Sequence, residues 1–285
     1  MSLYLFQILN GVGLGMIYFL MGVGLTIIFG MMNFVNFAHG AFYALGAYAC
    51  YVVMSITGSF WAGLVLAPIC IGILALGIEK VLVRRLYAVD HSIQILITIG
   101  VMMMIREGTL LIWGTVPKSI RVPELLAGIV AFDDFVYPVY RLFIVGVTAL
   151  IGIGLWLLLE KTRFGMVIRA GSERPHMVAL LGINIDKLFS MTFIGGVALA
   201  GVAGALIAPI RGVDAFMGVE ALGIAFVVVV IGGMGSFSGA LIGGLIVGLV
   251  QSFTSGFWPA GTNVMIYSVM ALIIMFRPNG LLGRA

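Results

Sequence analysis

The sequence predicts an all-α polytopic membrane protein with eight to ten transmembrane helices, some of them broken, in one domain over residues 1–285. Of the 285 residues, 62% are hydrophobic and 9% are charged, a composition typical of integral membrane proteins. Residues 1–78 contain no Asp, Glu, Lys or Arg, so they cannot form the surface of a soluble domain. The 40 glycines suit membrane helices that pack closely and break in places.

Apolar stretches of about 20 residues are long enough to cross a bilayer. The candidates are residues 3–29, 40–57, 61–83, 92–113, 139–159, 188–208, 221–231, 239–257 and 263–276. The stretch 221–231 is too short to be assigned as a span. The first stretch lacks the basic region and the small-residue cleavage pattern of a signal peptide, so we expect it to be retained.

Basic residues predict the orientation. Residues 80–91, 160–187 and 277–285 hold three, five and two Lys or Arg residues, whereas 114–141 and 211–220 together hold four. Cytoplasmic loops carry the excess of Lys and Arg. We therefore expect the first three segments to be cytoplasmic and residues 114–138 to form the longest outer loop.

One charged stretch interrupts the apolar chain. Eight of the 26 charged residues (15 basic and 11 acidic) lie within 160–187. Inside it, residues 172–182 predict a short amphipathic helix that Ser172 caps, with Pro175 in its first turn and Gly182 at its end. An apolar stripe at helical spacing comprises Met177, Val178, Leu180 and Leu181. Such a helix can dock into a groove on another protein or lie on lipid headgroups.

Two glycine-bounded polar breaks, residues 30–41 and 232–240, each precede a helix of small residues. Paired breaks in corresponding halves predict an internal repeat whose discontinuous helices line a path. Asn33, Asn36 and His39 lie within or beside the first break. Polar groups at membrane depth must face protein or a cavity, so they either satisfy backbone groups that the break frees or line a translocation path.

Arg106 and Glu107 interrupt the expected span 92–113. Ionised side chains inside a span usually face the bundle interior, which makes both candidates for the path. The alternative is that the helix ends near Ile105 and both lie close to an interface. As sequence neighbours they point about 100° apart, so we expect no simple facing pair.

The chain lacks the patterns of catalysis and cofactor binding. It has no Gly-Lys dipeptide, so a phosphate-binding loop of the common type is not expected. His39, His91 and His176 are far apart, which argues against a zinc site. The basic residues lie at helix ends, where membrane orientation rather than nucleic-acid binding explains them. We expect no enzyme activity, no metal and no cofactor on this chain.

Seven short motifs suggest a family. They are residues 24–30 (GLTIIFG), 36–42 (NFAHGAF), 45–48 (LGAY), 98–100 (TIG), 162–165 (TRFG), 181–184 (LGIN) and 232–236 (GGMGS). With these motifs in this order, the chain resembles the membrane-spanning permease subunit of bacterial ABC importers of the branched-chain amino acid class. The resemblance implies a single permease domain that forms the path for a small amino acid-like substrate by alternating access.

The resemblance also implies partners and a location. We expect two cytoplasmic ATPase subunits that bind ATP, a second permease subunit, a periplasmic substrate-binding protein and the lipid of the bacterial inner membrane. The docking residues within 160–187 would be Arg174, Met177, Ala179, Leu180, Leu181 and Gly182. Similar permeases carry urea, short amides or aromatic acids. A self-sufficient secondary transporter or channel is the alternative from another class, but Glu107 alone could serve its ion coupling.

Overall fold

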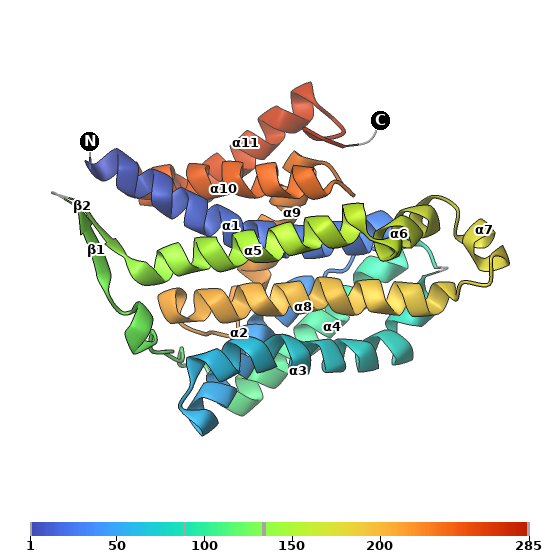
Figure 1. Cartoon of the computed structure of the whole chain (residues 1–285), viewed down its shortest axis with the longest axis horizontal. Coiled ribbons are helices and arrows are strands. Elements are labelled where there is room, and N and C mark those ends of the chain that lie inside the picture. The colour runs from blue at the N-terminus through green and yellow to red at the C-terminus, as the bar shows by residue number, and fades with distance from the viewer. Residues whose placement is uncertain (1, 88, 133–134, 284–285) are drawn as a thin grey trace.

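The computed structural model describes residues 2–87, 89–132 and 135–283 and shows a bundle of helices aligned along one long axis (Figure 1). Eight of the described helical segments are long and apolar enough to cross a membrane, which confirms the predicted fold class. The long helices are α1 Ser2–Met32, α2 His39–Thr57, α3 Phe60–Val81, α4 His91–Trp113, α5 Val139–Lys161, α8 Ile185–Arg211, α10 Phe237–Phe257 and α11 Thr262–Phe276. In the eighth segment, the 3-10 turn η3 Pro259–Gly261 leads into α11.

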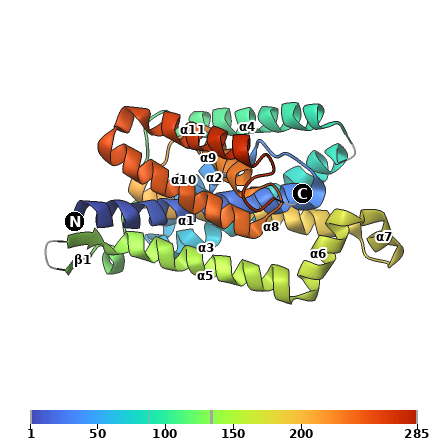
Figure 2. The same cartoon turned by 90° about the horizontal axis from the view of Figure 1, so that it is seen from above.

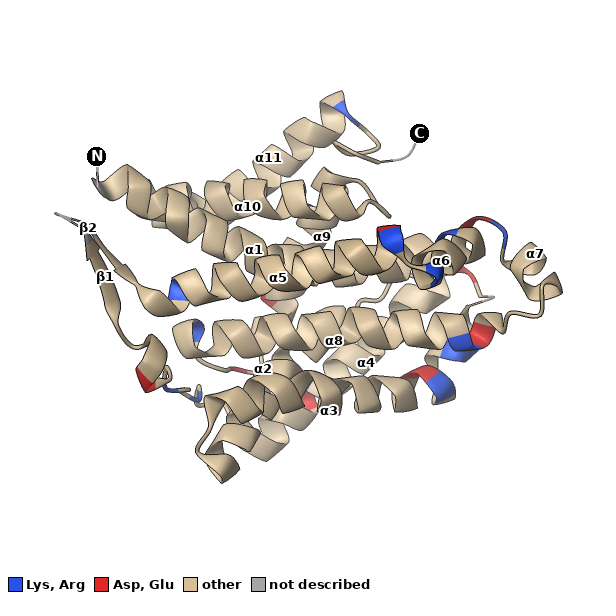
Figure 3. Ribbon diagram, viewed as in Figure 1, with Lys and Arg blue, Asp and Glu red and all other residues tan. Residues whose placement is uncertain are grey.

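Shorter elements lie between these helices. They are α6 Arg163–Glu173, α7 Pro175–Leu180, α9 Met217–Gly232, and the 3-10 turns η1 Val83–Leu86 and η2 Glu124–Leu126. We call the end of the bundle that carries η1, α6 and α7 the inner end, because the basic segments predict that it is cytoplasmic. The opposite end is the outer end. Charged residues gather toward the two ends and leave the middles of most helices uncharged (Figure 3).

Polar side chains fix where several helices begin. The hydroxyls of Ser59, Thr162 and Ser236 accept backbone N–H groups at the starts of α3, α6 and α10, and the Asn184 amide oxygen does so for α8. The Asp90 carboxylate accepts the Ser92 N–H at 2.8 Å at the start of α4, a bond that lowers the pKa of Asp90. These caps explain why the helices start at particular residues although the apolar stretches alone leave their limits open.

The backbones of α1 and α10 approach closely through glycines. A Cβ added at Gly15 would lie 2.8 Å from the carbonyl oxygen of Gly244, and one at Gly248 would lie 2.3 Å from that of Gly11. Side chains at these positions would push the helices apart. Small residues are the usual means of bringing membrane helices together.

The first predicted break lies between α1 and α2. Asn33 has a left-handed backbone with φ of 48°, and the chain then leaves helical geometry until His39. The Phe37 N–H donates to the Thr98 hydroxyl of α4 at 3.2 Å. A backbone group freed by the break is thus satisfied by a neighbouring helix, as membrane depth requires.

The second break lies between α9 and α10, where Gly233 and Gly235 have φ of 99° and 82°. The carbonyls of Ile231 and Gly232 accept N–H groups from Leu281 and Leu282 at 2.8 and 3.0 Å, so the C-terminal segment completes the end of α9. The two breaks lie against each other, because a Cβ added at Gly30 would lie 3.0 Å from the Cα of Gly235. The internal repeat itself stays a prediction.

The outer loop contains a β-hairpin, which the sequence did not predict. Strands β1 Ile129–Phe132 and β2 Phe135–Pro138 form an antiparallel pair in which Ile129 lies opposite Pro138. Nearby, Lys118 and Val213 exchange two backbone hydrogen bonds of 2.8 Å. These bonds tie the outer loop to the segment that follows α8.

The predicted orientation can be tested with single cysteines at exposed Ser119 and Lys187, in a background in which Cys50 and Cys70 are alanine. In intact cells, an impermeant maleimide should label Ser119→Cys and should label Lys187→Cys only after permeabilisation. The reverse pattern would place the charged segment outside and overturn the orientation.

Candidate docking and translocation site

The charged segment folds as two short helices rather than one. Ser172 is not a helix cap, contrary to the prediction: it lies inside α6, and its hydroxyl donates to the Arg169 carbonyl at 2.8 Å. The break falls at Arg174, whose φ of −141° and ψ of 70° are not helical. The physical reason is Pro175, because a proline disfavours helical geometry in the residue before it.

The end of α7 agrees with the prediction. Gly182 has φ of 80°, and its N–H donates to the Ala179 carbonyl at 3.0 Å. A residue with a side chain is strained in this conformation, whereas glycine adopts it freely.

The predicted apolar stripe on α7 is divided between two sides. Val178 is buried, with 4% of its surface exposed, whereas Met177, Leu180 and Leu181 are 55, 72 and 79% exposed. Val178 holds α7 against the rest of the chain. The other three leave an apolar surface uncovered at the inner end, where α7 projects beyond the bundle (Figures 1 and 2).

Asn36 and His39 are buried at the first break and bond to backbone atoms. The Asn36 amide oxygen accepts the Ala38 N–H at 3.1 Å. The His39 Nε2 lies 3.1 Å from the Met21 carbonyl, to which it donates in the Nε2–H tautomer. Asn33 is exposed at the inner end, with its Nδ2 3.2 Å from Nε2 of His91. Of these contacts, the one between Asn36 and Ala38 matches the structural alternative, because Met21 lies inside α1 rather than at the break and Asn33 contacts a side chain. A role in the path stays a prediction for all three.

Arg106 and Glu107 do form a pair, contrary to the expectation from their spacing. Nη2 of Arg106 lies 2.5 Å from Oε1 of Glu107, because both side chains are long enough to bend toward each other on the surface of α4. The helix continues through them to Trp113, so the alternative in which it ends near Ile105 is wrong. The Arg106 guanidinium also lies 5.7 Å from the centre of the Phe216 ring.

Two larger cavities lie along α5, at opposite ends of the bundle. The outer cavity has a volume of about 210 Å³ and lies between α1, α5, α8 and α10. The inner cavity has a volume of about 250 Å³ and lies between α1, the second break, the inner end of α5 and α6. None of the five path residues predicted from the sequence lines either cavity.

Phe19 lies between the two cavities along α1. Along α1 the outer cavity reaches Ile17 and the inner cavity begins at Thr26, so Phe19 lies in the interval between them. Its side chain is 1% exposed and packs edge-on against Phe237, with the ring centres 5.5 Å apart. A Cβ added at Gly152 of α5 would lie 2.8 Å from the Phe19 ring. The aromatic ring therefore fills the space between α1, α5 and α10.

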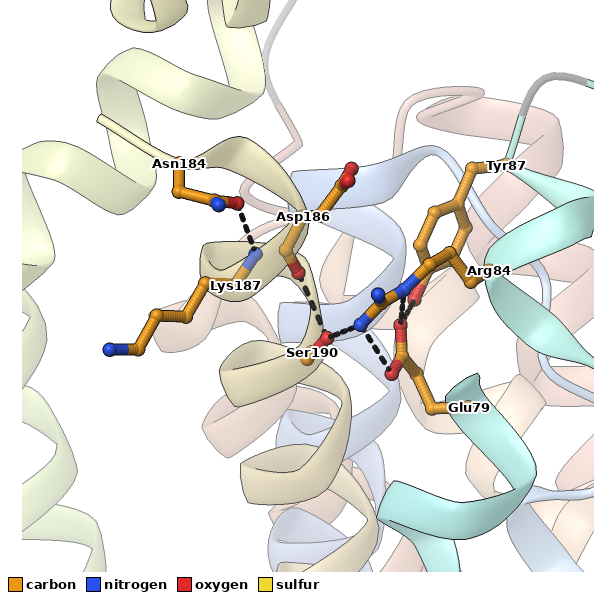
Figure 4. A network of polar contacts seen from close by, with 7 residues as sticks. All are labelled: Glu79, Arg84, Tyr87, Asn184, Asp186, Lys187 and Ser190. Atoms are coloured by element: carbon orange, nitrogen blue, oxygen red, sulfur yellow. Dashed lines mark hydrogen bonds and ion pairs between the residues drawn. The ribbon is translucent and has the colours of Figure 1, made fainter. Parts of the chain in front are cut away.

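The inner end also holds a buried carboxylate, that of Glu79. We call the network that it forms with Arg84, Tyr87 and Ser190 the Glu79 clasp (Figure 4). Glu79, near the end of α3, is fully buried. Nε and Nη2 of Arg84 donate to its two oxygens at 3.2 Å each, and the Tyr87 hydroxyl donates at 3.0 Å. Nη2 of Arg84 also donates to the Ser190 hydroxyl of α8 at 2.8 Å. The clasp thus joins α3 and η1 to the start of α8.

The clasp alters the acidity of its members. Its hydrogen bond with Glu79 raises the pKa of Arg84. Burial raises the pKa of Tyr87, and the nearby Glu79 carboxylate raises it further. Glu79 is not among the site residues predicted from the sequence, although an acidic residue near the end of an apolar stretch, followed by Arg five residues later, is a usable signal for such a contact.

Comparison with known proteins identifies the family. Residues 7–276 match the family described as branched-chain amino acid transport system / permease component. The chain belongs to this family. It is 32% identical over 99% of its length to the high-affinity branched-chain amino acid transport system permease protein BraD of Pseudomonas aeruginosa, 96% of which is covered. With LivH, the permease protein of the corresponding system in Escherichia coli K12, it shares 31% identity over 99% of this chain and 96% of that protein.

More distant similarity supports the same fold. The probable branched-chain amino acid transport permease protein LivH of Methanocaldococcus jannaschii is 30% identical over 93% of this permease and 88% of its own length. A solved chain of PsaBC from Streptococcus pneumoniae in complex with Fab superposes with a TM-score of 0.50 at 13% identity, covering 97% of this permease and 91% of that chain. This permease is therefore a multi-pass membrane protein and one component of a transport system.

Breaking the Glu79 clasp should destabilise the permease. Arg84→Ala would leave a buried carboxylate without its cation, which is strongly unfavourable. We expect its melting temperature in detergent to fall by about 5 °C or more, and Glu79→Gln in the same chain to restore much of the loss. The matched control is Arg85→Ala, because Arg85 is exposed and should change little. Equal melting temperatures for Arg84→Ala and Arg85→Ala would show that the clasp contributes nothing.

Proposed function

We propose that this permease is a membrane-spanning subunit of an ATP-driven importer of branched-chain amino acids in the bacterial inner membrane. The substrate class follows from the relatives, which are permease proteins of branched-chain amino acid transport systems. Two cytoplasmic ATPase subunits, a second permease subunit and a periplasmic substrate-binding protein complete the importer. The observation that carries the proposal is the uncovered apolar surface of α7 at the inner end.

The α7 surface suits docking in a groove of an ATPase. A helix in a groove buries apolar anchors on one face, and Met177, Leu180 and Leu181 supply them. Exposed Ala179 permits close approach between these anchors, and Gly182 ends the helix. Exposed Arg174 precedes the helix and can pair with acidic groups at the rim of the groove.

A displacement of α7 could reach the two cavities through α6 and α5. From α7 the chain leads back through α6 to the inner end of α5 (Figure 2), and α5 lines both cavities. If ATP binding displaces α7, α5 shifts relative to α1 and changes the packing around Phe19. Alternating access would then open the outer and inner cavities in turn, with Phe19 as the barrier between them.

The five residues predicted from the sequence to line the translocation path lie outside the lining of the two larger cavities. Asn33, Asn36 and His39 lie at the first break, and Glu107 is exposed on the single chain together with half-buried Arg106. In a permease dimer, surfaces that are exposed on one chain can face the second. These five residues stay candidates for contact with the substrate.

Leu180→Asp should uncouple the permease from its ATPases. It removes a leucine whose burial stabilises the contact by about 2 kcal/mol, and it places a charge in an apolar groove. We expect co-purification of the ATPases to fall about tenfold or more and leucine uptake to fall with it, while the amount of permease in the membrane is unchanged.

The matched control is Leu125→Asp in η2 at the outer end, since Leu125 is 83% exposed. This variant should keep its ATPases. If Leu180→Asp keeps its ATPases and normal uptake as well, α7 lies on lipid headgroups and the docking proposal fails.

Phe19→Ala should make the permease leak. We expect removal of the ring to open a route between the outer and inner cavities, so reconstituted importers should release preloaded leucine from liposomes without ATP. Phe34→Ala is the control, because Phe34 is equally buried but packs on Tyr87 and Phe193 at the inner end. Both variants lose about 3–5 kcal/mol of packing, so a leak in both would reflect damage to the fold. A Phe19→Ala importer that retains its preloaded leucine would contradict the proposed role of Phe19 as the barrier.

A further inference from the structure

Arginines line three cavities of the described chain, and their charge is balanced in two of them. In the inner cavity, Nη1 of Arg169 lies 3.5 Å from the Glu160 carboxylate. A small third cavity of about 10 Å³ between α2, α4 and α9 holds Arg106, which pairs with Glu107. In the outer cavity, Arg141 has no acidic partner among the described residues. Among the described residues, the positive charge of that cavity is therefore unbalanced.

Neutral groups hold Arg141 in place. Its Nη1 donates to the Asn10 amide oxygen of α1, and the Tyr137 hydroxyl lies 3.4 Å from the same oxygen. Arg141 itself is half-buried in the first turn of α5. A partly desolvated guanidinium with a neutral partner favours an anion, and carboxylates fit its fork of donors best.

The remaining lining of the outer cavity is mostly aliphatic. It includes Leu14, Ile17, Ile144, Ile207 and Ile210. Oxygen acceptors lie in the same lining on Asn10 and Ser255. One cation, an aliphatic wall and neutral acceptors match the carboxylate, the side chain and the ammonium of an aliphatic amino acid.

The volume of the outer cavity agrees with the size of an aliphatic amino acid. A cavity of about 150 Å³ holds benzene, which has six heavy atoms. In proportion, a ligand of about nine heavy atoms, such as leucine, needs about 225 Å³. The outer cavity provides about 210 Å³.

We propose that the outer cavity is a binding site for the substrate, in which Arg141 holds the α-carboxylate and the aliphatic wall holds the side chain. This inference rests on the proposed function, because it takes the substrate to be an aliphatic amino acid. The positive charge would also disfavour amino acids with cationic side chains. Arg141 thereby contributes to specificity as well as to affinity.

The test is protection of a cysteine at the mouth of the outer cavity. Ser255 lines the cavity and is exposed, so Ser255→Cys, with Cys50 and Cys70 replaced by alanine, can be labelled from outside in the assembled importer in liposomes. Leucine should slow its labelling. Leucinamide, which lacks the carboxylate, should require about 10- to 150-fold higher concentration, since a charge-assisted hydrogen bond is lost.

Arg141→Gln should raise the protective concentration of leucine by a similar factor. Arg121→Gln is the control, because it removes an exposed positive charge from the same predicted outer loop and should change nothing. Equal protection in Arg141→Gln and the parent, or no protection in a parent that transports leucine, would overturn the site and leave the importer function standing. Absence of leucine uptake by the parent importer would instead refute the proposed function.

Discussion

The close approach of the α1 and α10 backbones is the constraint on which the rest of the structure depends. Lipid tails are as apolar as the helix surfaces, so burial of apolar side chains gives little drive for two membrane helices to associate. Backbone contact at Gly15 and Gly248 supplies dense packing instead. Because α1 and α10 both line the outer and the inner cavity, this pair forms one wall of both cavities.

The opposite wall is held less firmly. Helix α5 buries four residues, Tyr140, Ile144, Thr148 and Gly152, whereas α8 buries fourteen. The remainder of α5 presents large apolar side chains such as Leu150 and Ile153 to the surroundings. Few buried contacts mean that a small displacement of α5 costs less free energy than one of α8. Of α1, α5 and α10, which line both cavities, α5 is therefore the helix best able to move.

Composition and charge predicted the spans, the breaks and the end of α7, since each depends on local sequence. Helix α8 begins at Ile185, three residues before the apolar stretch, because Asn184 caps it. Ser172 failed as a cap because Pro175 acts on Arg174. The link of the Glu79 clasp to α8 and the cavities could not be predicted. They join residues such as Arg84 and Ser190, or Asn10 and Arg141, that are 106 and 131 positions apart.

The Glu79 clasp explains how motion can be directed. The chain leaves α7 in two directions, through α6 to α5 and through residues 181–184 to α8. A buried ion pair adds little net stability compared with apolar packing, but it is costly to break and fixes geometry. Through Ser190, Arg84 ties the start of α8 to α3, so α8 resists displacement. Under the proposed coupling, a force applied at α7 would therefore move α5, because the connection to α8 is anchored by the clasp.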